Sequence, residues 1–123
     1  HDHAAPLSRL ASELVLRGYR VSFAIQEGGA HYTEGTGAQF VSLGPDIAEQ
    51  RSKLSNISLE SGVLNGLLAL VDGVYLPMSV PMFRALNATV LRDPPDIMVI
   101  DAAAVAGIDV AQLLQVPYVI NCP

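Results

Sequence analysis

With 123 residues, half of them hydrophobic, the chain is long enough for one domain with a sizeable core. A formal net charge of −5, without a cluster of Lys and Arg, argues against nucleic-acid or anionic-membrane partners. The longest uncharged apolar stretch, residues 61–71, is too short to span a bilayer, and a single cysteine, Cys122, excludes an internal disulfide framework.

The first expected element is a helix over residues 6–17. One face of it carries Leu7, Leu10, Ala11, Leu14 and Val15 at helical spacing. Pro6 is tolerated in a first helical turn, and Gly18 suits a helix end. His3 is therefore expected beside a helix N-terminus, where free backbone N–H groups favour an anionic leaving group.

Strands and helices alternate along the remaining chain. Strands are expected at residues 19–25, 38–43, 96–101 and 116–120. Helical segments are expected as one turn within 30–35, as a piece within the polar segment 46–61, over 62–91 and over 105–115. Pro77 and Pro81 should bend or divide the apolar segment 62–91 into two helices.

This alternation predicts an α/β fold with a doubly wound, Rossmann-like parallel sheet. The segment 96–101 is continuously apolar, which is typical of a buried parallel strand. Ligands of such sheets gather at the carboxyl ends of the strands. Asp101 and Asn121 each end a predicted strand, and His3 would share their edge if a strand preceded it.

The chain opens at the loop that should follow such a strand. In the common doubly wound order the first strand is central, so a sheet without it would have unpaired inner edges. Leu10 and Leu14 would then lack packing partners. We therefore expect residues 1–123 to be a fragment whose first strand is missing.

Two segments resemble the acceptor-binding domain of family 1 UDP-sugar-dependent glycosyltransferases. The first comprises His3-Ala4-Ala5-Pro6-Leu7, Leu10-Ala11 and Leu16-Arg17-Gly18-Tyr19-Arg20-Val21-Ser22-Phe23. The second comprises Pro95-Asp96-Ile97-Met98-Val99-Ile100-Asp101, Ala111, Leu114-Gln115-Val116-Pro117 and Asn121-Cys122-Pro123. Tyr19 stands where the family usually has a second histidine, a departure that touches packing and not chemistry.

The resemblance implies the N-terminal domain of a GT-B fold, two facing doubly wound domains with the active site between them. A C-terminal domain of the same protein, absent from this sequence, would bind the nucleotide sugar, so this chain alone should be inactive. The partners implied are a UDP-sugar, as co-substrate and not cofactor, and a small acceptor. The neutral, apolar middle segment favours an apolar acceptor with a hydroxyl group.

By the same resemblance, His3 would be the general base and Asp101 its partner. Histidine, with an ordinary pKa of about 6.5, is available as a neutral base at physiological pH. A carboxylate on its other ring nitrogen would fix the tautomer and stabilise the imidazolium. The alternative for Asp101 is a carboxylate that caps the following helix.

Other candidate residues are suited to binding more than to catalysis. Met78, Met82 and Phe83 suit either an apolar acceptor pocket or the core. Asn121 and Cys122 occupy the edge where the family often contacts sugar or acceptor. No histidine or cysteine spacing resembles a metal site, and the Gly35-Thr36-Gly37 segment precedes a strand, which argues against a dinucleotide fingerprint.

Two other functions fit the same pattern of elements. One is a non-catalytic α/β partner subunit that completes an enzyme with a second chain. The other is a flavodoxin-like binding module, which would need a phosphate-cradling loop or an acidic cluster at the sheet edge; the sequence shows neither.

Overall fold

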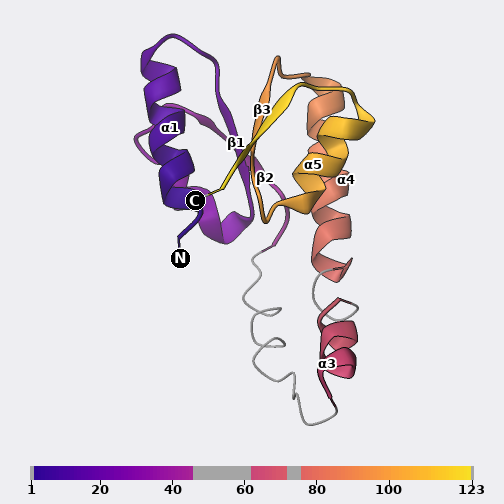
Figure 1. Ribbon diagram of the computed structural model, residues 1–123. Coiled ribbons are helices and arrows are strands. Elements are labelled where there is room, and N and C mark those ends of the chain that lie inside the picture. Colours follow the sequence, from indigo (N-terminus) through magenta and orange to yellow (C-terminus); the bar gives the residue numbers. More distant parts are fainter. Residues whose placement is uncertain (1, 46–61, 72–75, 123) are drawn as a thin grey trace.

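The computed structural model describes residues 2–45, 62–71 and 76–122, and its strands lie between helix α1 on one side and helices α4 and α5 on the other (Figure 1). The elements in order are α1 (Ala4–Leu16), β1 (Ser22–Ile25), the 3-10 helix η1 (Glu27–Thr33), β2 (Gln39–Ser42), α3 (Val63–Leu70), α4 (Leu76–Arg92), β3 (Met98–Asp101), α5 (Val105–Leu113) and β4 (Tyr118–Asn121). The helical piece expected within 46–61 lies outside the described residues.

Helix α1 starts two residues before the predicted helix and ends one residue earlier. Gly18 ends it with a φ of +91°, a left-handed conformation that glycine adopts without strain. The backbone N–H of Gly18 bonds the carbonyl of Val15, and that of Tyr19 bonds the carbonyl of Leu14. The helix end is therefore closed as the sequence predicted.

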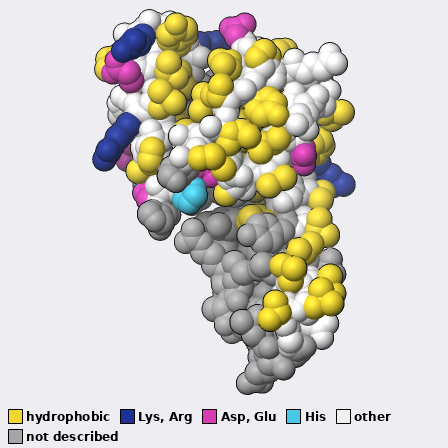
Figure 2. Space-filling view, viewed as in Figure 1, with side chains coloured by type: hydrophobic (Ala, Val, Ile, Leu, Met, Phe, Trp, Pro, Cys, Tyr) yellow, Lys and Arg dark blue, Asp and Glu magenta, His cyan; other side chains and the backbone are white. Residues whose placement is uncertain are grey.

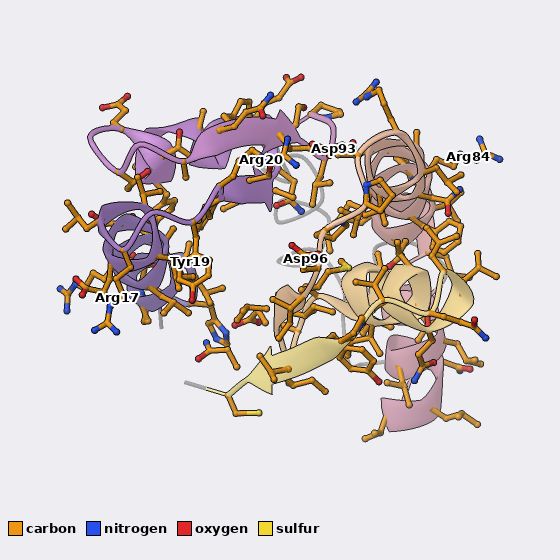
Figure 3. The ribbon with its side chains drawn as sticks, turned by 90° about the horizontal axis from the view of Figure 1, so that it is seen from above. Arg17, Tyr19, Arg20, Arg84, Asp93 and Asp96 are labelled. Atoms are coloured by element: carbon orange, nitrogen blue, oxygen red, sulfur yellow. The ribbon has the colours of Figure 1, made fainter. Side chains whose placement is uncertain are left out.

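The four strands form two parallel pairs, β1 with β2 and β3 with β4. The mixed α/β architecture and the parallel pairing predicted from the sequence are thus confirmed. In the part of the chain that the structure describes, the two pairs are separate sheets and not one. Seen from above, β1 and β3 are the inner strands of the two pairs (Figure 3).

The burial of β3 differs from the prediction of a fully buried strand. Ile100 is 4% exposed, whereas its neighbour Val99 is 37% exposed. On the apolar face of α1, Ala11 is buried but Leu10 is 40% exposed. Both side chains, Val99 and Leu10, lie in the part of the fold where the two strand pairs form separate sheets, so they are covered less completely than in one continuous sheet.

The core lies where α4 and α5 pack on each other. Leu43, Leu86, Val90 and Val110 form a buried cluster, and Met82, Phe83 and Met98 are among the half-buried side chains around it. Gly107 of α5 lies directly on Ile100, since a Cβ built on it would be 2.9 Å from the Ile100 Cγ2 atom. This close approach fixes α5 against the end of β3.

The prolines do not divide the apolar segment as predicted. Pro77 occupies the first turn of α4, and Pro81 lies inside the same helix, which continues to Arg92. The missing N–H of Pro81 removes a bond to the Pro77 carbonyl, a loss confined to the first two turns. Helix α3 ends at Leu70 and α4 begins at Leu76, and residues 72–75 lie outside the described residues.

Helix α3 is mostly exposed and apolar. Val63, Leu64, Leu67 and Leu68 are exposed along it, and hydrophobic side chains follow this part of the surface in Figure 2. Within the described residues, none of the helices combines the length and apolar character needed to cross a bilayer.

One ion pair joins the β1 side of the molecule to the end of α4. The guanidinium of Arg20 donates to the carboxylate of Asp93 at 3.0 Å (Figure 3). Both side chains are more than half exposed, so this pair stabilises the fold only slightly.

Candidate active site

The side chains of His3 and Asp101 are in contact. The Nδ1 atom of His3 lies 3.1 Å from Oδ2 and 3.2 Å from Oδ1 of Asp101. Because an ionised carboxylate only accepts hydrogen bonds, a hydrogen bond in this contact is donated by Nδ1, which in a neutral imidazole leaves Nε2 as the acceptor nitrogen. The imidazole is 47% exposed and the carboxylate 12% exposed, so the pair is open on the histidine side.

The backbone around Asp101 holds its carboxylate in place. Oδ1 accepts the N–H of Ala103 at 2.9 Å, and the Asp101 carbonyl accepts the N–H of Ala104 at 2.9 Å. Helix α5 begins at Val105 with Ala104 as its N-cap. The carboxylate therefore closes the turn ahead of α5 and does not cap that helix, the alternative that the sequence left open.

Asp2 caps helix α1 although His3 occupies the N-cap position. Its Oδ1 atom accepts the N–H of Ala4 at 3.0 Å and of Ala5 at 3.2 Å, and its Oδ2 atom accepts the hydroxyl of Tyr32 at 2.7 Å. The bond from Tyr32, followed by those from Ala5 and Ala4, lowers the pKa of Asp2 below that of an ordinary aspartate.

This cap changes one expectation from the sequence. The N–H groups of Ala4 and Ala5, expected to favour an anionic leaving group, are bound to Asp2. Pro6, the next residue, has no N–H. The carboxylate of Asp2 thus occupies the electropositive end of α1.

Asn121 lies beside Asp101 because the two residues are paired in the register of β3 and β4. Its carbonyl accepts the N–H of Ala102 at 3.0 Å. Its side-chain nitrogen is buried without a hydrogen-bond partner among the described residues. Cys122, the next residue, is an exposed free thiol.

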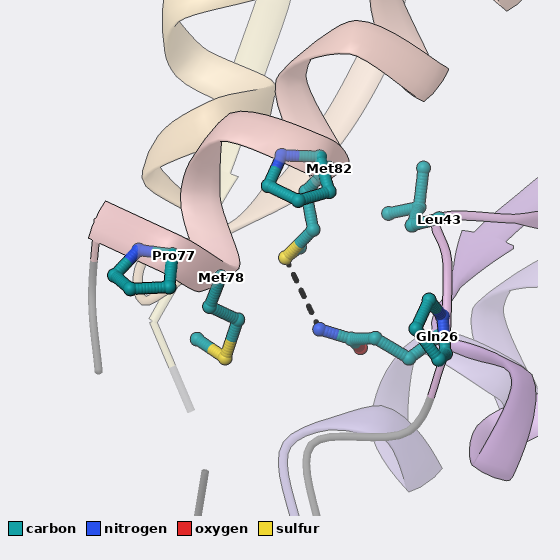
Figure 4. A pocket seen from close by; sticks show the side chains of 7 residues that line it. Gln26, Leu43, Pro77, Met78 and Met82 are labelled. Carbon is teal, nitrogen blue, oxygen red and sulfur yellow. Dashed lines mark hydrogen bonds between the residues drawn. The ribbon is translucent and has the colours of Figure 1, made fainter. Parts of the chain in front are cut away.

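A pocket lies between the start of α4 and the loops that follow β1 and β2 (Figure 4). It is lined by Gln26, Leu43, Pro45, Pro77, Met78, Pro81 and Met82. The side-chain amide of Gln26 donates to the sulfur of Met82 at 3.1 Å. Of the three apolar residues considered from the sequence, Met78 and Met82 line the pocket, whereas Phe83 does not; Met82 and Phe83 both pack against the core cluster.

Gln26 was missed in the sequence, although a signal was present. It directly follows Ile25, the last residue of β1, just as Asp101 and Asn121 end β3 and β4. The rule that ligands gather at the carboxyl ends of parallel strands applies to Gln26 as well. Its amide is the polar group in an otherwise apolar lining.

The arrangement can take up a proton at Nε2 of His3 and stabilise the resulting charge with Asp101. Among the residues that the structure describes, no group of three or more His, Cys, Asp or Glu side chains could hold a metal ion. The chemistry that the contact between His3 and Asp101 can perform is acid–base chemistry.

The chain is similar to a glycosyltransferase of known structure. The crystal structure of the glycotransferase of kitacinnamycin matches 94% of this chain with a TM-score of 0.66 and 25% sequence identity. This chain spans 26% of the length of that protein. No protein-family model matches the sequence, and no curated protein matches it. The structural match supports a glycosyltransferase fold.

Proposed function

We propose that this chain is the acceptor-binding domain of a glycosyltransferase, with His3 as the general base and Asp101 as its partner. The observation that carries the proposal is the contact of 3.1 Å between Nδ1 of His3 and the Asp101 carboxylate. The likeness to a glycosyltransferase over 94% of the chain supports it independently.

The proposed reaction moves one proton and one glycosyl group. Nε2 of His3 removes the proton of an acceptor hydroxyl while that oxygen forms a bond to the anomeric carbon of the donor sugar. The bond from the anomeric carbon to the nucleotide diphosphate breaks, and its electron pair leaves with the diphosphate. Asp101 stabilises the imidazolium that forms and keeps the hydrogen on Nδ1.

We assign the acceptor to the pocket lined by Gln26, Met78 and Met82. Gln26 and Leu43 directly follow β1 and β2, so the pocket lies at carboxyl strand ends, as Asp101 does. Methionine side chains adapt to irregular apolar surfaces, and one amide can orient a hydroxyl group. The acceptor class that fits is a small apolar molecule with a hydroxyl.

The proposal includes a second domain that binds a UDP-sugar, in the GT-B arrangement of family 1. It also includes a central strand between β1 and β3. A strand there would join the two sheets into one doubly wound sheet and would pack against Leu10 and Val99, which are now exposed.

The test measures transfer from a UDP-sugar to an apolar hydroxyl acceptor by an enzyme that contains this chain. We expect His3→Ala to lower kcat by about 10²- to 10⁴-fold and to leave acceptor binding, measured by calorimetry, within about threefold of wild type. Normal turnover of the His3→Ala variant would disprove the proposed role of His3.

A further inference from the structure

The geometry points to Asp2 and Tyr32 as positioning residues that hold the His3 imidazole against Asp101. The inference deepens the proposed function and depends on it, because it gives these residues a role through the general base.

The carboxylate of Asp2 encloses His3 in a short hydrogen-bonded loop. It precedes His3 in the chain, and its Oδ1 atom bonds the N–H groups of Ala4 and Ala5, which follow His3. The backbone of His3 is thereby fixed from both sides, with φ −76° and ψ −24°. Because the imidazole of His3 is about half exposed, its orientation depends on this backbone and on the contact with Asp101.

The second carboxylate oxygen of Asp2, Oδ2, connects the start of α1 to another element. Oδ2 accepts the Tyr32 hydroxyl at 2.7 Å, and Tyr32 belongs to η1, a different element. Ser8 of α1 donates to the Tyr32 carbonyl at 2.6 Å, so Tyr32 is attached to α1 at two points. These two hydrogen bonds hinder rotation of α1 relative to η1. They therefore restrict the orientation of the His3 imidazole.

Tyr32 is itself held within η1. Its ring packs against that of His31, with 4.2 Å between centroids, and His31 bonds the Gly28 carbonyl through Nδ1 at 3.1 Å. The position of the His3 imidazole therefore depends on the conformation of the segment between β1 and β2. A small displacement of the base slows a proton transfer steeply, since the reacting atoms must align.

The first experiment follows the ring nitrogens of His3 by NMR in the enzyme that contains this chain, comparing Tyr32→Phe with Tyr118→Phe. Tyr118→Phe is the control, because it also removes a tyrosine hydroxyl that takes part in a hydrogen bond. The Tyr118 hydroxyl accepts a hydrogen bond from the side-chain amide of Gln112 at 3.1 Å. We expect the Nδ1–H tautomer of His3 to predominate in wild type and in Tyr118→Phe, and to lose its predominance in Tyr32→Phe. An unchanged tautomer ratio in Tyr32→Phe would overturn the inference.

The second experiment measures kcat and KM for glycosyl transfer in the enzyme that contains this chain. We expect Tyr32→Phe to lower kcat about tenfold, with KM for the acceptor within about twofold, and Tyr118→Phe to change neither. Asp2→Asn should lower kcat less than Asp2→Ala, because the amide oxygen still caps α1. Assays well below the thermal midpoint of each variant separate these effects from unfolding.

A double variant separates failure of this inference from failure of the proposed function. On a His3→Ala background, Tyr32→Phe should not reduce the residual rate further, because no base is left to position. Full activity of His3→Ala would overturn the proposed function. Loss of activity in His3→Ala with a normal kcat in Tyr32→Phe would overturn only the positioning role.

Discussion

The Nδ1 atom of His3 lies 3.1 Å from Oδ2 of Asp101, although 98 positions separate the two residues in the sequence. His3 stands at the start of α1, and Asp101 is the last residue of β3. The contact therefore joins two elements at the edge where the parallel strands end. In the neutral imidazole this contact leaves Nε2 as the acceptor nitrogen.

Replacing Asp101 by Asn should lower kcat by roughly 10³-fold or more. The amide keeps the shape of the carboxylate, but it neither stabilises the imidazolium nor enforces the Nδ1–H tautomer. Steady-state glycosyl transfer measures the effect. Asp96→Asn, the same change at an exposed position ahead of β3, should leave kcat within about twofold. Equal effects of the two substitutions would contradict the role of Asp101.

The substitution Gln26→Leu should raise KM for a hydroxyl-bearing acceptor by about three- to tenfold, with a smaller change in kcat. The reason is the loss of one hydrogen bond, which contributes about 0.5–1.5 kcal/mol. Gln39→Leu on the exposed side of β2 is the matched control and should leave KM unchanged. An unaltered KM in Gln26→Leu would place the acceptor elsewhere.

The pKa of Asp2 makes the stability of the fold depend on pH. Its pKa is lowered in the folded chain, chiefly by Tyr32, so the ionised carboxylate stabilises the fold above the ordinary aspartate pKa of about 4. That contribution is lost as the pH falls through the lowered pKa. Thermal midpoints between about pH 5 and about pH 2 should therefore fall more steeply in wild type than in Asp2→Asn, with Tyr32→Phe intermediate. Parallel curves for all three proteins would contradict this.

Adding one methyl group at Gly107 should destabilise the chain by about 1–2 kcal/mol, measured by urea unfolding of Gly107→Ala. The new Cβ atom would lie 2.9 Å from Cγ2 of Ile100, which is buried and cannot move away freely. The second variant, Ile100→Leu, has no Cγ2 atom. The double variant should therefore recover part of the loss, and strictly additive effects would argue against this contact as the cause.

The proposal of a central strand between β1 and β3 leads to a prediction about Leu10. In the present chain Leu10 is 40% exposed, so Leu10→Ala should cost less than about 1 kcal/mol. Extending the chain before His1 by an apolar strand should raise the thermal midpoint and increase the cost of Leu10→Ala to about 2–3 kcal/mol. Leu16→Ala, at a side chain that is 79% exposed, is the control and should cost little in both chains. An equal cost of Leu10→Ala in both would contradict the strand.

Local chemistry predicted the elements well. The helix spacing of Leu7 to Val15 and the glycine at position 18 located α1 within two residues, because periodicity and helix ends depend on near neighbours. Strands β1, β2 and β3 each lie within a predicted strand, whereas β4 begins two residues after the predicted 116–120 starts and ends one residue beyond it. Pro81 shows the limit of such rules, since packing of α4 keeps the helix intact around it.

The candidate site could be predicted only as a set of residues at strand ends. His3, Asp101 and Asn121 were identifiable, since the end of a parallel strand is visible in the sequence. The Asp2–Tyr32 bond and the approach of Gln26 to Met82 were not, because these contacts join residues 30 and 56 positions apart. Met82 and Phe83 both pack against the core cluster, but only Met82 of the two also lines the pocket, which depends on how α4 packs on its neighbours.

The sequence by itself determined the helices, the strands, their parallel α/β class and the residues that end each strand, since these follow from spacing and backbone preference along the chain. Only the tertiary structure decided that His3 touches Asp101, that Asp2 occupies the end of α1, and that the strands form two separate pairs. The physical reason is that such contacts depend on how whole elements pack, and packing joins side chains that no local pattern relates.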